Sequence, residues 1–202
     1  MNDDRTRGGA GREEDPGVRW MLAFQQGEEE AFDRIVEAYQ GAVFGLLRRL
    51  LGPHPAIEDL AQEVFVRLYR SRERYRPQGR LSTFLYRITW NLALNALRDS
   101  KRQRTLSLPV DRQGAPLDLA DPEAAEPSDS VQLESWAGRI EAALAALPEN
   151  QRTALVLQHY DGLDLQEIGE ILGISPKAVK SLLHRARTRM RELLRPYYEA
   201  EQ

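Results

Sequence analysis

Apolar residues recur at steps of three and four along most of this 202-residue chain. That spacing places them on one face of an α-helix. In the segment from Glu28 to Leu51 they fall at Phe32, Ile35, Tyr39, Val43, Leu46, Leu47 and Leu50. Alternation of apolar and polar residues, which is typical of a half-buried strand, is absent. The pattern therefore predicts an all-α protein.

Capping and helix-breaking residues divide this pattern into separate elements. In the first half we predict helices at Val18–Gly27, Glu28–Leu51, Ala56–Arg72 and Ser82–Arg102, with Ser82 as the N-cap of the last. In the second half, one helix begins near Val131 and another begins at Pro148 and ends at Asp161-Gly162. Two more helices form a helix-turn-helix.

Composition predicts two small helical domains joined by a linker. Residues 1–17 are rich in Gly, Asp and Arg and lack periodicity, so we expect a disordered tail. Residues 105–130 contain four prolines among acidic and small residues, which predicts a flexible acidic linker. The two domains are then residues 18–104 and 131–195, followed by a tail at 196–202.

The most specific motif is the helix-turn-helix from Asp164 to Arg187. Asp164 and Glu167 have the spacing of a capping box, and Gly173 stands where the chain must turn sharply. The second helix has an apolar back and a polar, mostly basic front made of Lys177, Lys180, Ser181, His184, Arg187, Thr188 and Arg191. Such a helix fits the major groove of DNA. The alternative is an ordinary helical hairpin with a solvated basic face.

Two helices of the first domain carry more apolar surface than one core face needs. The helix at 56–72 adds Phe65, Val66 and Tyr69 to its main stripe, so it is either central to the core or shared with a partner. In the helix at 82–102, aromatic residues interleave with a basic stripe. Rings beside cations suit single-stranded DNA, although each ring could equally belong to the core.

The net charge of −3 conceals strong segregation. Residues 60–104 contain eleven basic and three acidic side chains, and residues 175–195 contain seven basic and one acidic. Between them, residues 106–135 contain seven acidic side chains and one basic. Two basic blocks indicate two contacts with a polyanion. The absence of cysteine excludes disulfides and thiol chemistry, and no apolar run could span a membrane, so we expect a cytoplasmic protein without cofactors.

Four motifs in order resemble the extracytoplasmic-function (ECF) class of bacterial sigma factors. They are Asp59-Leu-Ala-Gln-Glu-Val-Phe-Val-Arg-Leu-Tyr, Ser82-Thr-Phe-Leu-Tyr-Arg-Ile-Thr-Trp-Asn, Leu147-Pro-Glu-Asn-Gln-Arg-Thr-Ala-Leu and the helix-turn-helix. The resemblance covers about residues 18–195. It implies sigma regions two and four in a protein that is not an enzyme. Such a protein binds core RNA polymerase, recognises promoters and promotes DNA melting.

The resemblance also implies roles for individual residues. The face that docks on the clamp helices of the largest polymerase subunit would comprise Asp59, Gln62, Glu63, Phe65 and Tyr69. The minus-ten and melting residues would be Phe84 at the edge of the opened duplex, Arg87, Trp90 and Asn91 around a flipped base, and Arg98, Lys101 and Arg102 on phosphates. The minus-thirty-five element would face Lys177, Lys180, Ser181, His184 and Arg185, with region four on the flap of the second-largest subunit.

The sequence leaves the promoter, the role of the linker and two alternative functions open. Lys177-Ala178 stands where the family often has Gly-Thr, and Leu182 stands where it often has Arg, so the promoter sequence is undetermined. The acidic linker could enter a polymerase channel or act as a simple tether. An anti-sigma factor is a candidate partner, since the family often has one. A free-standing helix-turn-helix regulator and a polymerase-docking adaptor are the alternative functions. No phosphate loop or nucleophile–base motif indicates an enzyme.

Overall fold

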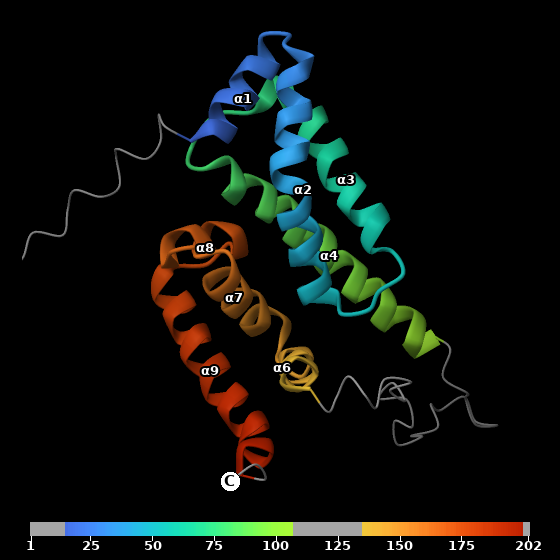
Figure 1. Ribbon diagram of the computed structural model, residues 1–202, viewed down its shortest axis with the longest axis vertical. Coiled ribbons are helices and arrows are strands. Elements are labelled where there is room, and N and C mark those ends of the chain that lie inside the picture. Colours follow the sequence, from blue (N-terminus) through green and yellow to red (C-terminus); the bar gives the residue numbers. More distant parts are fainter. Residues whose placement is uncertain (1–14, 107–134, 200–202) are drawn as a thin grey trace, which may run out of the picture.

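The computed structural model describes residues 15–106 and 135–199, in two helical halves (Figure 1). The N-terminal half contains α1 (Pro16–Gln25), α2 (Glu29–Leu51), α3 (Ile57–Arg70), the 3₁₀ turn η1 (Arg72–Arg74) and α4 (Leu81–Leu106). The C-terminal half contains α6 (Trp136–Ala145), α7 (Glu149–Tyr160), α8 (Leu165–Leu172) and α9 (Pro176–Glu199). No strand occurs in these ranges, so the all-α prediction is confirmed. None of their helices is long and apolar enough to cross a membrane.

Helix α1 begins at Pro16, so residues 15–17 do not belong to a disordered tail as predicted. The Asp15 side chain caps this helix, because its Oδ1 accepts the Gly17 N–H at 3.0 Å. Proline suits the first helical position, where its missing N–H would have no partner in the helix. The start of α1 thus depends on a cap and a proline, in a segment without apolar periodicity. The rest of the predicted tail lies outside the described residues.

Helices α4 and α9 both extend beyond their predicted ends. Helix α4 starts at Leu81, so Ser82 lies within the first turn and is not the N-cap, and it ends at Leu106, inside the predicted linker. Helix α9 continues through Pro196 into the predicted C-terminal tail, where Arg195 pairs with Glu199 across the proline at 3.7 Å. The remainder of the linker and the predicted helix start near residue 131 lie outside the described residues.

Helices α1 to α4 pack around an apolar core. The buried face of α2 repeats at steps of three and four and consists of Ala31, Ile35, Val43, Leu46, Leu47 and Leu50. Leu68 of α3 and Leu81 and Leu85 of α4 are fully buried in the same core. Burying one such side chain contributes about 1.5–3 kcal/mol relative to leaving it exposed. Packing of these faces, more than helix propensity, therefore holds the N-terminal half together.

Helix α8 starts with the predicted capping box. Asp164 Oδ1 accepts the N–H groups of Gln166 at 2.8 Å and Glu167 at 2.9 Å. In return, Glu167 Oε2 accepts the Asp164 N–H at 3.0 Å. These bonds satisfy donors that would otherwise have no partner at the helix start.

The turn between α8 and α9 also follows the sequence. Gly173 ends α8 with φ 69°, a left-handed conformation that favours glycine. Ser175 Oγ then accepts the Ala178 N–H at 3.3 Å, and Pro176 opens α9. The apolar back of α9 is buried at Val179, Leu183 and Ala186. Its opposite face is left in solvent.

The two halves pack against each other, with α4 beside α8 and α2 beside α7. The Arg152 guanidinium of α7 donates to the carbonyl oxygen of Leu50 near the end of α2 at 2.5 Å. It also donates to the carbonyl oxygens of Ala145 at 2.8 Å and Leu147 at 3.3 Å, near the end of α6. One cationic side chain thus caps the C-termini of two helices from different halves.

A second polar contact joins α4 to the end of α7. The Tyr86 hydroxyl donates to Asp161 Oδ1 at 3.1 Å. Burial raises the pKa of Asp161, and the Tyr86 hydrogen bond and the nearby Arg49 oppose that rise. Arg49 also stacks over the Tyr160 ring, with its Cζ 4.2 Å from the ring centroid. Polar and aromatic contacts therefore fix how the halves meet.

Gly169→Ala should destabilise the C-terminal half. A Cβ at residue 169 would lie 2.7 Å from the Ile174 carbonyl oxygen, a backbone atom in the turn before α9. We expect a loss of about 1–3 kcal/mol in the free energy of unfolding, measured by denaturant titration. The control is Gly41→Ala on the exposed side of α2, where a Cβ meets nothing within 4 Å. It should gain about 0.5–1 kcal/mol, and equal losses in both variants would contradict the explanation.

Candidate nucleic-acid and polymerase interfaces

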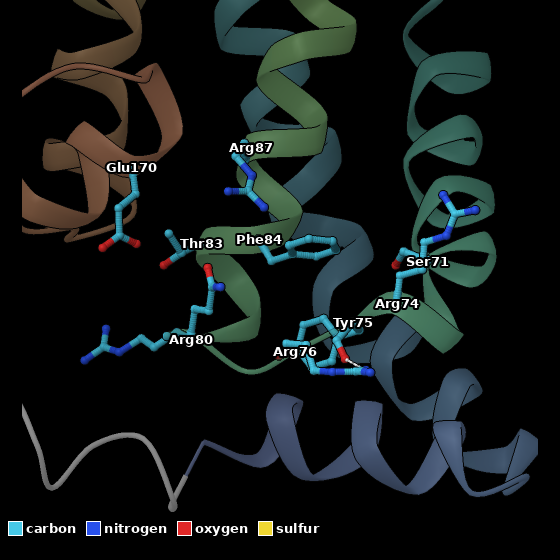
Figure 2. A pocket seen from close by; sticks show the side chains of 11 residues that line it. Ser71, Arg74, Tyr75, Arg76, Arg80, Thr83, Phe84, Arg87 and Glu170 are labelled. Atoms are coloured by element: carbon cyan, nitrogen blue, oxygen red, sulfur yellow. Dashed lines mark hydrogen bonds between the residues drawn. The ribbon is translucent and has the colours of Figure 1, made fainter.

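A cavity of about 300 Å³ opens between the loop after α3, the first turns of α4 and helix α8 (Figure 2). It is lined by Ser71, Arg74, Tyr75, Arg76, Gln78, Gly79, Arg80, Thr83, Phe84, Arg87 and Glu170. We call it the α4 pocket. Its volume is at the lower end of the range for small-molecule sites. Four arginines against one carboxylate suit an anionic ligand.

Aromatic rings contribute to the α4 pocket. The rings of Phe84 and Tyr75 meet nearly edge to face, with centroids 5.4 Å apart. Tyr75 is buried, whereas Phe84 is only partly buried. The Arg87 Cζ lies 5.3 Å from the Phe84 centroid, within the range of a cation–π contact. A nucleobase can stack on such a ring while the neighbouring guanidinium groups hold its phosphates.

Polar groups complete the pocket. Arg76 Nη1 donates to the carbonyl oxygens of Tyr75 at 2.9 Å and Glu73 at 3.2 Å, which restrains its guanidinium. Thr83 Oγ1 is buried and has no hydrogen-bond partner in the described part of the chain. A buried hydroxyl in this state is ready to bond a ligand. Glu170 enters from α8, on the side of the C-terminal half (Figure 2).

Only some of the predicted minus-ten residues lie at this pocket. Phe84 and Arg87 line it, whereas Asn91 is exposed one turn further along α4. The other exposed basic residues, nearer the end of the helix, are Arg98, Lys101 and Arg102. Trp90 is 4% exposed, belongs to the apolar core and does not line the pocket. Its predicted role at the base-binding site stays a prediction.

The predicted minus-thirty-five residues lie together on the exposed face of α9. All five are solvent-exposed, namely Lys177, Lys180, Ser181, His184 and Arg185. A shallow groove runs over the last four of them. Arg187, two residues after Arg185, donates to Gln158 Oε1 of α7 at 2.6 Å. The free face of α9 is therefore basic and narrow, as a major-groove helix requires.

Helix α3 presents a mixed polar and apolar stripe. Asp59 and Gln62 are exposed, and Val66 and Tyr69 keep 40% and 45% of their surface exposed. The Tyr69 ring packs against two neighbouring rings, 5.1 Å from Phe24 and 5.2 Å from Phe32.

The two other predicted docking residues on α3 are less open. Glu63 is half-buried and accepts from Arg67 Nε at 2.8 Å, and Phe65 packs against the core. Helix α3 thus packs into the core and keeps an exposed apolar strip at Val66 and Tyr69.

Comparison with known proteins decides the family. Family models match the chain over residues 35–103 (Sigma-70 region 2) and 137–190 (Sigma-70, region 4). The ECF RNA polymerase sigma factor SigW of Bacillus subtilis is 35% identical over 175 residues, covering 85% of this chain and 92% of SigW. The chain belongs to the ECF family of RNA polymerase sigma factors. The sigma factor CarQ of Myxococcus xanthus is 34% identical over 86% of this chain and 95% of its own.

Solved structures share the fold of this sigma factor. CnrH, solved in complex with the cytosolic domain of CnrY, aligns with a TM-score of 0.68 and 21% identity, over 90% of this chain and 99% of that chain. The sigma factor RpoE of Bartonella quintana, solved with the anti-sigma factor NepR, aligns with a TM-score of 0.61 and 22% identity, over 81% and 96% of the two chains. Both alignments span the N- and C-terminal halves.

Most of the α4 pocket in this sigma factor was not predicted as a site. Its lining comes largely from residues 71–80, the loop between α3 and α4, for which we predicted no site. The density of arginines in that loop was the available signal, but we used those arginines only as part of the basic block at residues 60–104. Glu170 could not be found this way, because it reaches the pocket from a distant part of the chain.

Glu170→Gln should raise the affinity of this sigma factor for single-stranded DNA. The change removes the one carboxylate that lines a pocket rich in arginine. We expect a gain of about three- to tenfold at low salt, equivalent to roughly 1 kcal/mol, which shrinks as salt screens the charges. Fluorescence anisotropy with a labelled oligonucleotide measures it. Glu37→Gln, an equal charge change at an exposed site on α2, is the control, and an equal gain there would contradict the assignment.

Proposed function

We propose that this sigma factor captures a base of the promoter minus-ten element in the α4 pocket. The observation that carries the proposal is the joint presence of the Phe84 ring, the Arg87 guanidinium and a buried, unpartnered Thr83 hydroxyl in one cavity. Stacking on a ring contributes about 1–3 kcal/mol per base, which offsets the few kcal/mol needed to flip it. Asn91, Arg98, Lys101 and Arg102 continue the basic side of α4 for the phosphates of the melted strand.

The exposed face of α9 serves as the reader of the minus-thirty-five element in this proposal. Base contacts from Lys180, Ser181, His184 and Arg185 supply sequence preference, whereas phosphate contacts supply salt-dependent affinity. We assign region two to residues 18–104, extended to Pro16 by α1, and region four to residues 131–195, extended to Glu199 by α9. The acidic linker between them remains a candidate occupant of a polymerase channel.

Helix α3 forms the proposed contact with the clamp helices of core RNA polymerase. Its exposed stripe combines carboxylate and amide groups with an apolar strip around Val66 and Tyr69. Region four docks on the flap of the second-largest subunit. The polymerase performs the chemistry, so the sigma factor itself is a binding and melting factor in the bacterial cytoplasm. The anti-sigma factor in the RpoE complex supports a partner of that class here.

Reconstituted transcription tests this function. The sigma factor is mixed with sigma-free core polymerase and genomic DNA fragments, and the RNA start sites are mapped. Starts that share two spaced upstream elements support the proposal. Core binding without specific starts would favour an adaptor. Tight duplex binding without core binding would favour a free-standing regulator.

Combined replacement Lys180→Ala and Arg185→Ala should abolish use of the minus-thirty-five element. Both side chains lie in the exposed groove of α9, away from the pocket on α4. We expect a loss of about tenfold or more in holoenzyme affinity for a promoter duplex and a lower salt dependence. Arg19→Ala with Arg34→Ala, on α1 and α2, gives the same charge change at exposed sites and should leave promoter affinity unchanged. A similar loss in this control would show that net charge alone acts.

Combined replacement Asp59→Ala and Gln62→Ala should weaken binding to core polymerase. The two residues are exposed on α3, so the change should leave the fold intact. We expect roughly a tenfold loss, the size of one or two interface hydrogen bonds, in a competition assay against a second sigma factor. Asp33→Ala, at an exposed site on α2, is the control. Unchanged core binding with reduced promoter use would place α3 at DNA instead.

A further inference from the structure

One carboxylate joins the starts of two helices that are far apart in the sequence. Asp15 Oδ1 accepts the Gly17 N–H of α1 at 3.0 Å. Asp15 Oδ2 accepts the Leu81 N–H at the start of α4 at 2.8 Å. Both N–H groups lie at helix N-termini, where the helix dipole favours a negative charge. The side chain thus acts as a clip between α1 and α4.

The surroundings of the clip are closely packed and leave it little freedom. Burial, together with the nearby Asp15 carboxylate, raises the pKa of Tyr39 to about 12, so the phenol stays protonated. A Cβ on Gly17 would lie 2.9 Å from Leu81 Cβ and would also collide with the Tyr39 hydroxyl. The first turns of α1 and α4 therefore touch, and only glycine fits at residue 17.

The clip and the α4 pocket share the start of α4. The first two turns of α4 carry Thr83, Phe84 and Arg87, which line the pocket. Tyr75, which packs edge-on against Phe84, is close enough to Asp15 for the carboxylate to add to the rise that burial gives the Tyr75 pKa. A shift of the α4 start would move these pocket groups together.

We propose that Asp15 is a positioning residue for minus-ten recognition. Its carboxylate holds the first turn of α4 against α1 and thereby sets the Phe84 ring and the Arg87 guanidinium for a flipped base. The proposal rests on the proposed function of the α4 pocket. The sign of the change in DNA affinity tests the proposal, because Asp15 is also a negative charge near a DNA site. If it acted only through charge, removing it would strengthen DNA binding, whereas loss of the clip weakens it.

Two substitutions separate the clip from ordinary helix capping. Asp15→Ser keeps an N-cap oxygen for α1 but has no second oxygen for the Leu81 N–H. Asp15→Ala loses both bonds. Ser135→Ala is the matched control, since Ser135 Oγ caps α6 by accepting the Gly138 N–H at 3.1 Å, away from the pocket. Each variant is assembled as holoenzyme with core polymerase.

The assay measures holoenzyme affinity for a fork DNA that exposes a single-stranded minus-ten element, and for a minus-thirty-five duplex. We expect Asp15→Ser and Asp15→Ala to weaken fork binding about tenfold, the size of one hydrogen bond to a charged group. Duplex binding and core binding should stay unchanged, and Ser135→Ala should change none of the three. Stronger fork binding, wild-type fork binding in Asp15→Ser, or equal losses on both DNAs would overturn the proposal.

Amide hydrogen exchange of the free protein tests the clip without DNA. In Asp15→Ser, exchange in the first turn of α4 should accelerate while the first turn of α1 stays protected. Unchanged exchange at Leu81 would overturn the proposal regardless of the DNA result. Failure of the wild-type holoenzyme to bind the fork, with the exchange result as expected, would instead reject the function proposed for the α4 pocket.

Discussion

Helix α4 has to bury side chains toward two neighbours at once, and the arrangement of the whole molecule follows from that requirement. One side packs into the core of α1, α2 and α3, and another packs against α8 of the C-terminal half. Tyr86 is 6% exposed and bonds to Asp161 of the C-terminal half, and Trp90 is 4% exposed. Arg87 and Asn91 of the same helix stay exposed. The pocket forms at the start of the helix, where the arginine-rich loop supplies the remaining walls.

Features set by local sequence could be predicted, because their energetic causes lie within a few residues. The capping box at Asp164, the left-handed Gly173 and the apolar face of α2 are examples. The exposed basic face of α9 is another, since a helix with a buried apolar back must turn its front to solvent. The same holds for the surplus of apolar surface on α3, part of which remains exposed at Val66 and Tyr69.

Features set by contacts between distant segments could not be predicted in this way. Helical periodicity places Trp90 beside Arg87, but it does not reveal that neighbours pack against α4 on two sides. Glu170 and Asp15 were missed for the same reason. Each belongs to the pocket region only because the fold brings residues from the other half, or from 66 positions away, to the start of α4. The roles that the family resemblance implies also depend on such contacts, and they stay predictions.

The polar contacts between the halves each contribute little net free energy. Arg80 pairs with Glu167 at 3.7 Å, but the arginine side chain is 60% exposed, and such pairs contribute about 0–1 kcal/mol. The Tyr86–Asp161 bond is more buried, yet Asp161 Oδ2 has no partner among the described residues, and burial of that carboxyl costs free energy that the bond must offset.

By contrast, the fully buried aliphatic side chains of both halves belong to one apolar cluster. Each of those contributes about 1.5–3 kcal/mol, more than one polar contact between the halves. Apolar packing, more than these polar contacts, therefore stabilises the arrangement of the two halves. Because Glu170 lies at the pocket only through this contact, separating α8 from α4 removes the one carboxylate among the pocket's lining residues.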